Sequence, residues 1–301
     1  MKTVVKVPGS CGELWQGVLD GEHLLITCPV NVYSYVEINI DESISRIKAP
    51  DDKYKSREAM RKVLDYFGMH KCGGEICINS KIPQEKGMSS STADIVGTCI
   101  GTAEALGRNL TPLEIAGIAV SIEPTDSLMF KDIVTFDHVG GSIKEYIGIP
   151  PEMDILIVDL GGRVNTLEFD IRRDEILKKF NNALELREAY ELVKEGIRKK
   201  DIHMIGKGAT MSAEFNQKIL HKRELMYLIK IANELGACGI NTAHSGTVVG
   251  ILFSPGQIDM QAVICRIEKR FKAKFTFYIT KLVNGGGELV ETSARRQFIP
   301  N

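Results

Sequence analysis

The chain has 301 residues, of which 44% are hydrophobic and 26% charged, a composition typical of one large or two smaller globular domains. Its 38 Lys and Arg balance 39 Asp and Glu, so it lacks the basic excess of a nucleic-acid-binding protein. No apolar run approaches the roughly 20 residues that a membrane span needs. We therefore expect neither nucleic acid nor membrane as a partner, and the sequence carries no signature of an oligomeric state.

The seven cysteines indicate a reducing compartment. Their number is odd and no Cys-x-x-Cys pair occurs, which argues against a disulfide framework and against a zinc site. Most of them lie among apolar residues and are expected to be buried. The N-terminus alternates like a strand, and its apolar stretch is too short for a signal peptide. These features predict a cytoplasmic protein.

The first half of the chain alternates strand and helix patterns. Residues 31–40 are rich in β-branched and aromatic residues and alternate with period 2, as in a strand. Thr111 and Glu114 form a capping box at the start of a helix, which Pro124 is expected to end at Glu123. The prediction for this half is strands at 24–29, 31–40 and 75–82 and helices at 54–68, 91–106 and 111–123.

The second half repeats the alternation. It opens with the apolar run 154–160, which predicts a buried strand. Pro150 and Pro151 mark the expected boundary between two domains, residues 1–150 and 151–301. The fold class is therefore mixed α/β. The predicted elements here are strands at 154–160, 248–253 and 275–282 and helices near 172–200, 201–217, 221–235 and 258–271.

The loop at 83–92 is the strongest candidate for a functional site. It places Gly87 and three consecutive serines, Ser89 to Ser91, between a strand and a helix. Unpaired backbone N–H groups and the positive dipole end at a helix N-terminus suit phosphate, and a serine hydroxyl there can ligate Mg²⁺. A serine-rich helix cap that binds nothing is the alternative. The segment is neither a Walker A loop nor a Gly-x-Ser-x-Gly elbow.

Two carboxylates, Glu123 and Asp126, lie three residues apart in Glu-Pro-Thr-Asp. A carboxylate in the last turn of a helix opposes the helix dipole, and a bound metal would offset that cost for Glu123. Asp126 could accept a proton or align a substrate hydroxyl. The alternative is a solvated helix end followed by a turn aspartate.

A third segment, residues 236–250, is rich in small residues and leads into a strand. Small side chains let the backbone approach a ligand closely. A plain tight turn explains the composition equally well.

In combination, these three segments resemble the GHMP kinase superfamily, which includes galactokinase, homoserine kinase and mevalonate kinase. The central family pattern is Pro-x-x-x-Gly-Leu-Gly-Ser-Ser-x-Ala. Met88 and Ser89 stand where the family has Leu and Gly, and His244 and Ser245 interrupt the third segment. The residues that match the central pattern are Pro83, Gly87, Ser90, Ser91 and Ala93.

Three runs narrow the resemblance to the L-threonine kinase branch, whose product supplies the aminopropanol linker of cobalamin. They are Pro-Gly-Ser-Cys-Gly-Glu-Leu at 8–14, Met-Ser-Ser-Ser-Thr-Ala-Asp at 88–94 and Glu-Pro-Thr-Asp-Ser at 123–127. The resemblance implies an N-terminal domain like ribosomal protein S5 and a C-terminal ferredoxin-like α/β domain. It also implies a phosphotransferase that uses ATP and Mg²⁺ on the alcohol group of a small molecule.

The resemblance also implies roles for individual residues. Ser90 and Glu123 would hold Mg²⁺, and both count as catalytic together with Asp126, the candidate base. In mevalonate-kinase-like members the aspartate lies farther beyond the glutamate, so Asp126 could bind substrate instead. Glu13 and Gln16 would reach the acceptor or serve a structural turn. The residues expected at the ATP phosphates are Pro83, Gly87, Met88, Ser89, Ser90, Ser91 and Thr92, and those at the acceptor are Glu13, Gln16, Asp126 and His244.

Two other functions remain compatible with the sequence. One is a kinase of the same family that acts on homoserine or another small alcohol. The other is a nucleotide-binding regulator that has lost catalysis, although the presence of Ser90 and Glu123 argues against it. A binding module without nucleotide is a more distant alternative. A panel of alcohols offered with ATP separates these readings.

Overall fold

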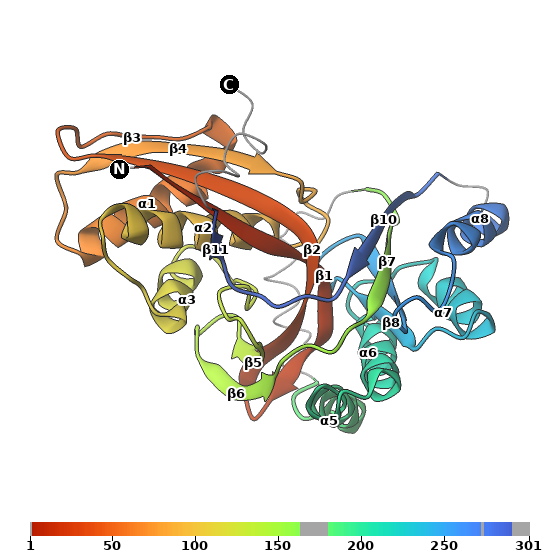
Figure 1. Cartoon of the computed structure of the whole chain (residues 1–301). Coiled ribbons are helices and arrows are strands. Elements are labelled where there is room, and N and C mark those ends of the chain that lie inside the picture. The colour runs from red at the N-terminus through yellow and green to blue at the C-terminus, as the bar shows by residue number, and fades with distance from the viewer. Residues whose placement is uncertain (1, 163–179, 272–273, 291–301) are drawn as a thin grey trace.

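A computed structural model describes residues 2–162, 180–271 and 274–290 (Figure 1). The strands are β1 Lys2–Leu19, β2 Glu22–Asp41, β3 Ile47–Lys48, β4 Gly73–Ser80, β5 Ile133–Asp137, β6 Ile143–Gly148, β7 Asp154–Asp159, β8 Gly239–Thr242, β9 Val248–Phe253, β10 Thr276–Lys281 and β11 Glu288–Leu289. The helices are the 3-10 turn η1 Asp51–Lys53 and the α-helices α1 Tyr54–Tyr66, α2 Ser90–Ala105, α3 Pro112–Val120, α5 Leu184–Lys199, α6 Ile202–Asn216, α7 Leu225–Glu234 and α8 Met260–Phe271.

The strands form one sheet with the order β10-β7-β9-β8-β1-β2-β4-β3. Its pairs are antiparallel except for β3 with β4. β11 adds to β1, and the hairpin β5–β6 adds to β2. Figure 1 shows α1, α2 and α3 gathered beside the first strands and α6, α7 and α8 beside the later ones.

The long hairpin β1–β2 is interrupted where it approaches the functional residues. Its register shifts between Pro8 and Gly9, between Ser10 and Glu13, and between Glu13 and Trp15. Such bulges bend a strand and redirect its side chains. They therefore allow residues 10–16 to serve both the sheet and the adjacent cleft.

Helix α2 is almost entirely buried, and two glycines let it approach the sheet closely. A Cβ built on Gly97 would lie 2.7 Å from Cγ2 of Val36, and one built on Gly101 would lie 2.7 Å from Cγ1 of Ile38. Neither position has room for a side chain. The close packing fixes the N-terminus of α2, at Ser90, relative to β1 and β2.

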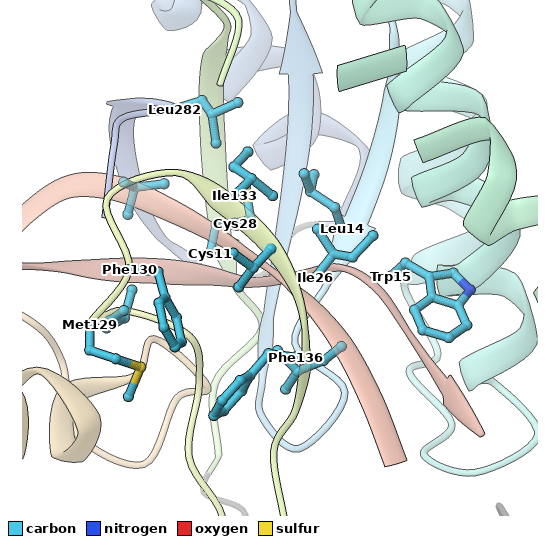
Figure 2. Packing of buried hydrophobic residues seen from close by; sticks show 14 of the residues in the cluster. Cys11, Leu14, Trp15, Ile26, Cys28, Met129, Phe130, Ile133, Phe136 and Leu282 are labelled. Carbon is cyan, nitrogen blue, oxygen red and sulfur yellow. The ribbon is translucent and has the colours of Figure 1, made fainter. Parts of the chain in front are cut away.

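The largest hydrophobic cluster lies around the middle of β1 and β2 and draws on residues from both halves of the chain. Figure 2 shows Trp15 at the edge of this cluster, next to the helices, with Leu14 and Ile26 close by. The Trp15 indole Nε1 donates to the carbonyl of Leu186 at 2.8 Å, so its polar atom is satisfied inside the core. The packing holds α5 against the hairpin.

Most of the predicted elements are confirmed, and the β-strand 248–253 agrees at both ends. Helix α3 has the predicted capping box but ends at Val120, so the prediction that it reaches Glu123 is wrong. The helix expected near 172–200 is described from Leu184 onward; 172–179 lie outside the described residues, and 180–183 are not helical. The sequence analysis missed the hairpin β5–β6 and strand β8.

Five of the seven cysteines are buried, as expected for most of them, whereas Cys77 and Cys265 are exposed. No helix in the described part of the chain is long and apolar enough to cross a membrane. The domain boundary near residue 150 stays a prediction.

Candidate functional site

A cleft of about 330 Å³ lies where the predicted segments meet. One side is the loop 83–89 with the start of α2, and a second is the turn 123–126. The beginning of α1 and two residues of β1, Glu13 and Gln16, complete it. All the predicted site residues line this cleft except His244.

The loop at the cleft has a backbone that requires glycine at Gly87. Its φ of +78° lies in the left-handed region, and a Cβ there would lie 2.3 Å from the Cβ of Ala243. Backbone hydrogen bonds hold the loop on both sides. The amide of Ser10 donates to the carbonyl of Met88 at 3.0 Å, and the amide of Thr247 donates to the carbonyl of Lys86 at 3.0 Å.

The small residues of the third segment serve this loop. A Cβ on Gly246 would lie 2.4 Å from the Cα of Gly87, and one on Gly12 would lie 2.4 Å from the Cα of Ala243. The expectation was close approach to a ligand. The structure shows close approach to the loop backbone, through which the C-terminal half supports the cleft, and the approach to a ligand stays a prediction.

The N-terminus of α2 offers unpaired donors to the cleft. Its cap residue, Ser89, makes no side-chain capping bond, and no acidic residue occupies the first turn. The hydroxyl of Ser90 is buried and, within the described part of the chain, has no hydrogen-bond partner. The amides of a first helical turn and the positive dipole end favour an anion such as phosphate.

Glu123 bonds to Ser91 and Lys55. The Ser91 hydroxyl donates to one carboxylate oxygen of Glu123, and the Lys55 ammonium contacts the other. Because α3 ends at Val120, Glu123 lies in the turn beyond the helix and not in its last turn. The argument from an opposed helix dipole therefore does not apply, and the Lys55 ion pair neutralises the carboxylate instead.

Asp126 faces the loop from the same turn. The Ser89 hydroxyl donates to Asp126 Oδ2 at 2.6 Å, and a second contact joins Ser89 to the hydroxyl of Ser10. The Thr92 and Thr125 hydroxyls, 2.9 Å apart, tie the turn to α2. The two carboxylates that the sequence placed three residues apart thus contact neighbouring serines of one loop.

Glu13 lines the cleft from β1, and His244 holds its carboxylate in place. The backbone N–H of His244 donates to Glu13 Oε2 at 2.9 Å, and its ring Nδ1 lies 2.9 Å from the same oxygen. Both side chains are buried, with 8% of Glu13 and 4% of His244 exposed. His244 therefore supports Glu13 and does not itself line the cleft.

Gln16, three residues after Glu13 in β1, also lines the cleft. Its Nε2 lies 3.3 Å from Nε2 of His138, which also lines the cleft. Its Oε1 is buried and has no partner within the described ranges. The pair offers polar atoms to a small polar ligand beside Glu13.

Sequence reasoning missed four charged residues around the cleft. Lys53 pairs with the buried Asp94 at 2.8 Å, and burial raises the pKa of Asp94 although hydrogen bonds from Lys53 and Ser34 lower it. Lys55 and Lys222 also lacked a sequence signal. Only Asp94 had one, as the last residue of the run 88–94.

Lys222 is a buried cation near Glu13. Its ammonium donates to the carbonyl of Ala243 at 2.8 Å, next to His244. Burial lowers its pKa to about 8, and the nearby Glu13 acts in the opposite direction. A positive charge therefore lies near the Glu13 carboxylate.

The site fits a nucleotide-bound Mg²⁺ better than a protein-only metal centre. Mg²⁺ is usually bound by one or two carboxylates together with substrate phosphates and water. Glu123, Ser91 and the unpartnered hydroxyl of Ser90 supply hard oxygen atoms next to the loop 83–89. Among the described residues no group of three or more His, Cys, Asp or Glu side chains could hold a metal by itself.

Comparisons with known proteins identify the family. Residues 54–131 match the family model for the GHMP kinases N terminal domain, and residues 193–273 match the GHMP kinases C terminal model. The L-threonine kinase of Citrobacter freundii is 32% identical over 95% of this chain and 99% of its own. The L-threonine kinase of Salmonella typhimurium strain LT2 is 32% identical over 95% of each chain.

Among solved structures, the homoserine kinase from Cytophaga hutchinsonii superimposes with a TM-score of 0.75 over 96% of this chain and 97% of its own, at 16% identity. At that identity the likeness concerns the fold alone. It confirms the predicted mixed α/β, two-domain kinase fold. With both family models matched in order and full-length relatives at 32% identity, this chain belongs to the GHMP kinase family.

Proposed function

We propose that this chain transfers the γ-phosphate of ATP to the hydroxyl group of L-threonine. The observation that carries the proposal is one cleft lined by the loop 83–89 with the start of α2, by the buried carboxylate of Glu13 and by Asp126. We call the part formed by the loop the nucleotide end and the part around Glu13 the acceptor end. Two relatives named L-threonine kinase, alike over nearly their whole length, support the choice of acceptor.

At the nucleotide end, the loop 83–89 and the first turn of α2 bind the phosphates. Pro83, Gly87 and Met88 shape the loop, and the amides of Ser89 to Thr92 donate to phosphate oxygens. Bound Mg²⁺ would neutralise charge on the β- and γ-phosphates. We assign its protein ligands to Glu123 and Ser91, which are already joined by a hydrogen bond, with the buried Ser90 hydroxyl, the ligand predicted from the sequence, beside them.

At the acceptor end, Glu13 binds the ammonium group of threonine. The carboxylate is anchored through one oxygen by His244 and lines the cleft. Gln16 and His138 offer polar atoms for the rest of the amino acid. An ammonium group would add a charge-assisted hydrogen bond to the carboxylate that His244 already holds.

In the reaction, the threonine hydroxyl oxygen forms a bond to the γ-phosphorus. The bond from that phosphorus to the β–γ bridging oxygen breaks, and ADP leaves with the electron pair. Asp126 accepts the hydroxyl proton. Positioning and electrostatic stabilisation of a loose transition state supply most of the acceleration.

The resemblance extends the proposal to the biological context. O-phospho-L-threonine would serve the aminopropanol linker of cobalamin. A cytoplasmic location, with its reducing conditions, suits the seven cysteines, all of which are free in the structure.

The test is an acceptor panel. The purified full chain is incubated with ATP and Mg²⁺ and with threonine, serine, homoserine or mevalonate, and ADP release is followed. We expect the highest kcat/KM for threonine. A higher kcat/KM for homoserine would overturn the acceptor while leaving the kinase in place. No turnover of any alcohol despite ATP binding would favour the inactive regulator.

A further inference from the structure

Ser89 adopts a backbone conformation that normally calls for glycine. Its φ is +58° and its ψ is +31°, in the left-handed region. A side chain raises the energy of the backbone there, and such conformations persist at functional sites because the surroundings hold them. The GHMP pattern has glycine at this position, so this chain keeps a serine where glycine would be less strained.

The hydroxyl of Ser89 gives the reason for the serine. It has one proton, which it donates to the carboxylate of Asp126 at 2.6 Å. In its contact with Ser10, Ser89 must therefore accept, and Ser10 must donate. The result is a directed chain of hydrogen bonds from Ser10 through Ser89 to Asp126.

The three members come from separate parts of the sequence. Ser10 lies in β1, Ser89 caps α2, and Asp126 lies in the turn after α3. Each belongs to one of the three runs that distinguish the threonine kinase branch, 8–14, 88–94 and 123–127. This chain of hydroxyls and carboxylate joins the three runs through their side chains.

We propose that Ser89 is a positioning residue that holds the Asp126 carboxylate in line with the acceptor hydroxyl. A hydrogen bond to one carboxylate oxygen limits rotation of the group, so that its orientation is fixed before substrate binds. The proposal rests on the proposed phosphorylation of an alcohol in this cleft. Ser89 takes no part in bond making; its contribution is the orientation of Asp126.

The test separates the effect of the Ser89 hydroxyl from the effect of its strained backbone. Ser89→Gly removes the hydroxyl and the strain, whereas Ser89→Ala removes the hydroxyl and keeps the strain. We expect kcat to fall by about 10- to 100-fold in both, the cost of a lost bond to a charged group, with KM for ATP unchanged. The melting temperature should be higher for Ser89→Gly than for Ser89→Ala, because only glycine relieves the backbone.

Lys200→Gly is the matched control. Lys200 also has a positive φ, +56°, but it is exposed at the end of α5. The same relief of strain there should leave turnover unchanged. If Lys200→Gly lowers kcat as much as Ser89→Gly does, or if Ser89→Gly turns over like the wild type, the proposal is overturned.

A double-mutant cycle with Asp126→Asn tests the connection directly. If Ser89 acts through Asp126, Ser89→Gly should cost little once Asp126 is Asn; full additivity overturns the proposal. All assays use the alcohol that the wild type phosphorylates fastest. A best acceptor other than threonine therefore contradicts the proposed substrate while the role of Ser89 is still decided, and no turnover of any alcohol overturns both.

Discussion

The two ends of the cleft are built in different ways. The nucleotide end consists largely of one contiguous stretch, the loop 83–89 with the start of α2. The acceptor end is assembled from side chains far apart in the sequence, such as Glu13 and His244, which are 231 residues apart. Local sequence patterns can therefore predict the nucleotide end, whereas the residues of the acceptor end come together only in the folded chain.

The difference also appears in charge. At the nucleotide end, Lys53 and Lys55 are each paired with a carboxylate, Asp94 and Glu123. At the acceptor end, the buried Lys222 donates to the backbone carbonyl of Ala243. We therefore expect substitutions at the nucleotide end to change kcat and substitutions at the acceptor end to change KM for threonine.

The largest effect on kcat is expected for Asp126→Asn, a change at the proposed base. The change keeps the shape and removes the proton acceptor, so kcat should fall by about 10²–10⁴. Steady-state kinetics with threonine measure it, with Asp41→Asn at the exposed end of β2 as control. A large rise in KM with kcat almost unchanged would show instead that Asp126 binds the ammonium group.

At the nucleotide end, Glu123→Gln should lower kcat by about 10²–10³, because it removes charge from the metal position. Ser91→Ala and Ser90→Ala then distinguish the two serines. We expect the larger loss for Ser91, which is bonded to Glu123. Turnover is measured at saturating Mg²⁺, and folding is checked by circular dichroism. Wild-type turnover by Glu123→Gln would remove this residue from the site.

At the acceptor end, Glu13→Gln should raise KM for threonine by about 10- to 100-fold, the loss of a hydrogen-bonded charge, and leave KM for ATP unchanged. The matched comparison is 3-hydroxybutyrate, which has the hydroxyl and the carboxylate but no ammonium. Its weak turnover should be the same with either enzyme. An equal rise in KM for both acceptors would contradict the assignment of Glu13 to the ammonium group.

The smallest effect on activity and the clearest pH dependence are expected for Lys222→Met. The folded protein holds the Lys222 proton with a pKa of about 8, against 10.5 for an ordinary lysine. Between these values the unfolded chain binds more protons, so wild-type stability rises with pH, by up to about 1.4 kcal/mol per pH unit. Below that window the full cost of the buried charge is present.

Lys222→Met lacks this cost, so its stability relative to the wild type should be greatest near neutral pH and decline as the pH rises through about 8. Urea denaturation between pH 7 and 9.5 measures the difference. KM for threonine should rise slightly because Glu13 loses a nearby positive charge. A stability difference that is constant across this range would show that burial does not lower the pKa of Lys222.

The sequence predicted the parts that depend on local signals. The capping box of Thr111, the loop around Gly87 and the strand at 248–253 each carry their information in a few neighbouring residues. The hairpin β5–β6 was missed because its strands are short and paired with irregular register. The end of α3 was placed too late because Pro124 limits how far a helix can run but does not require it to run that far.

The acceptor end shows where sequence reasoning stops. The sequence led to His244 as a substrate residue, but its contact with Glu13 depends on a strand pairing that joins β1 to β8. Lys222 had no signal, since a lysine between two helical segments is ordinarily solvated. Long-range packing determines both positions.

The most direct test of the central claim is ³¹P nuclear magnetic resonance of a reaction that contains the wild-type chain, ATP, Mg²⁺ and L-threonine. The account predicts a phosphomonoester signal that coincides with added O-phospho-L-threonine and grows in step with ADP. Release of ADP with inorganic phosphate alone, or an unchanged ATP spectrum, would contradict it.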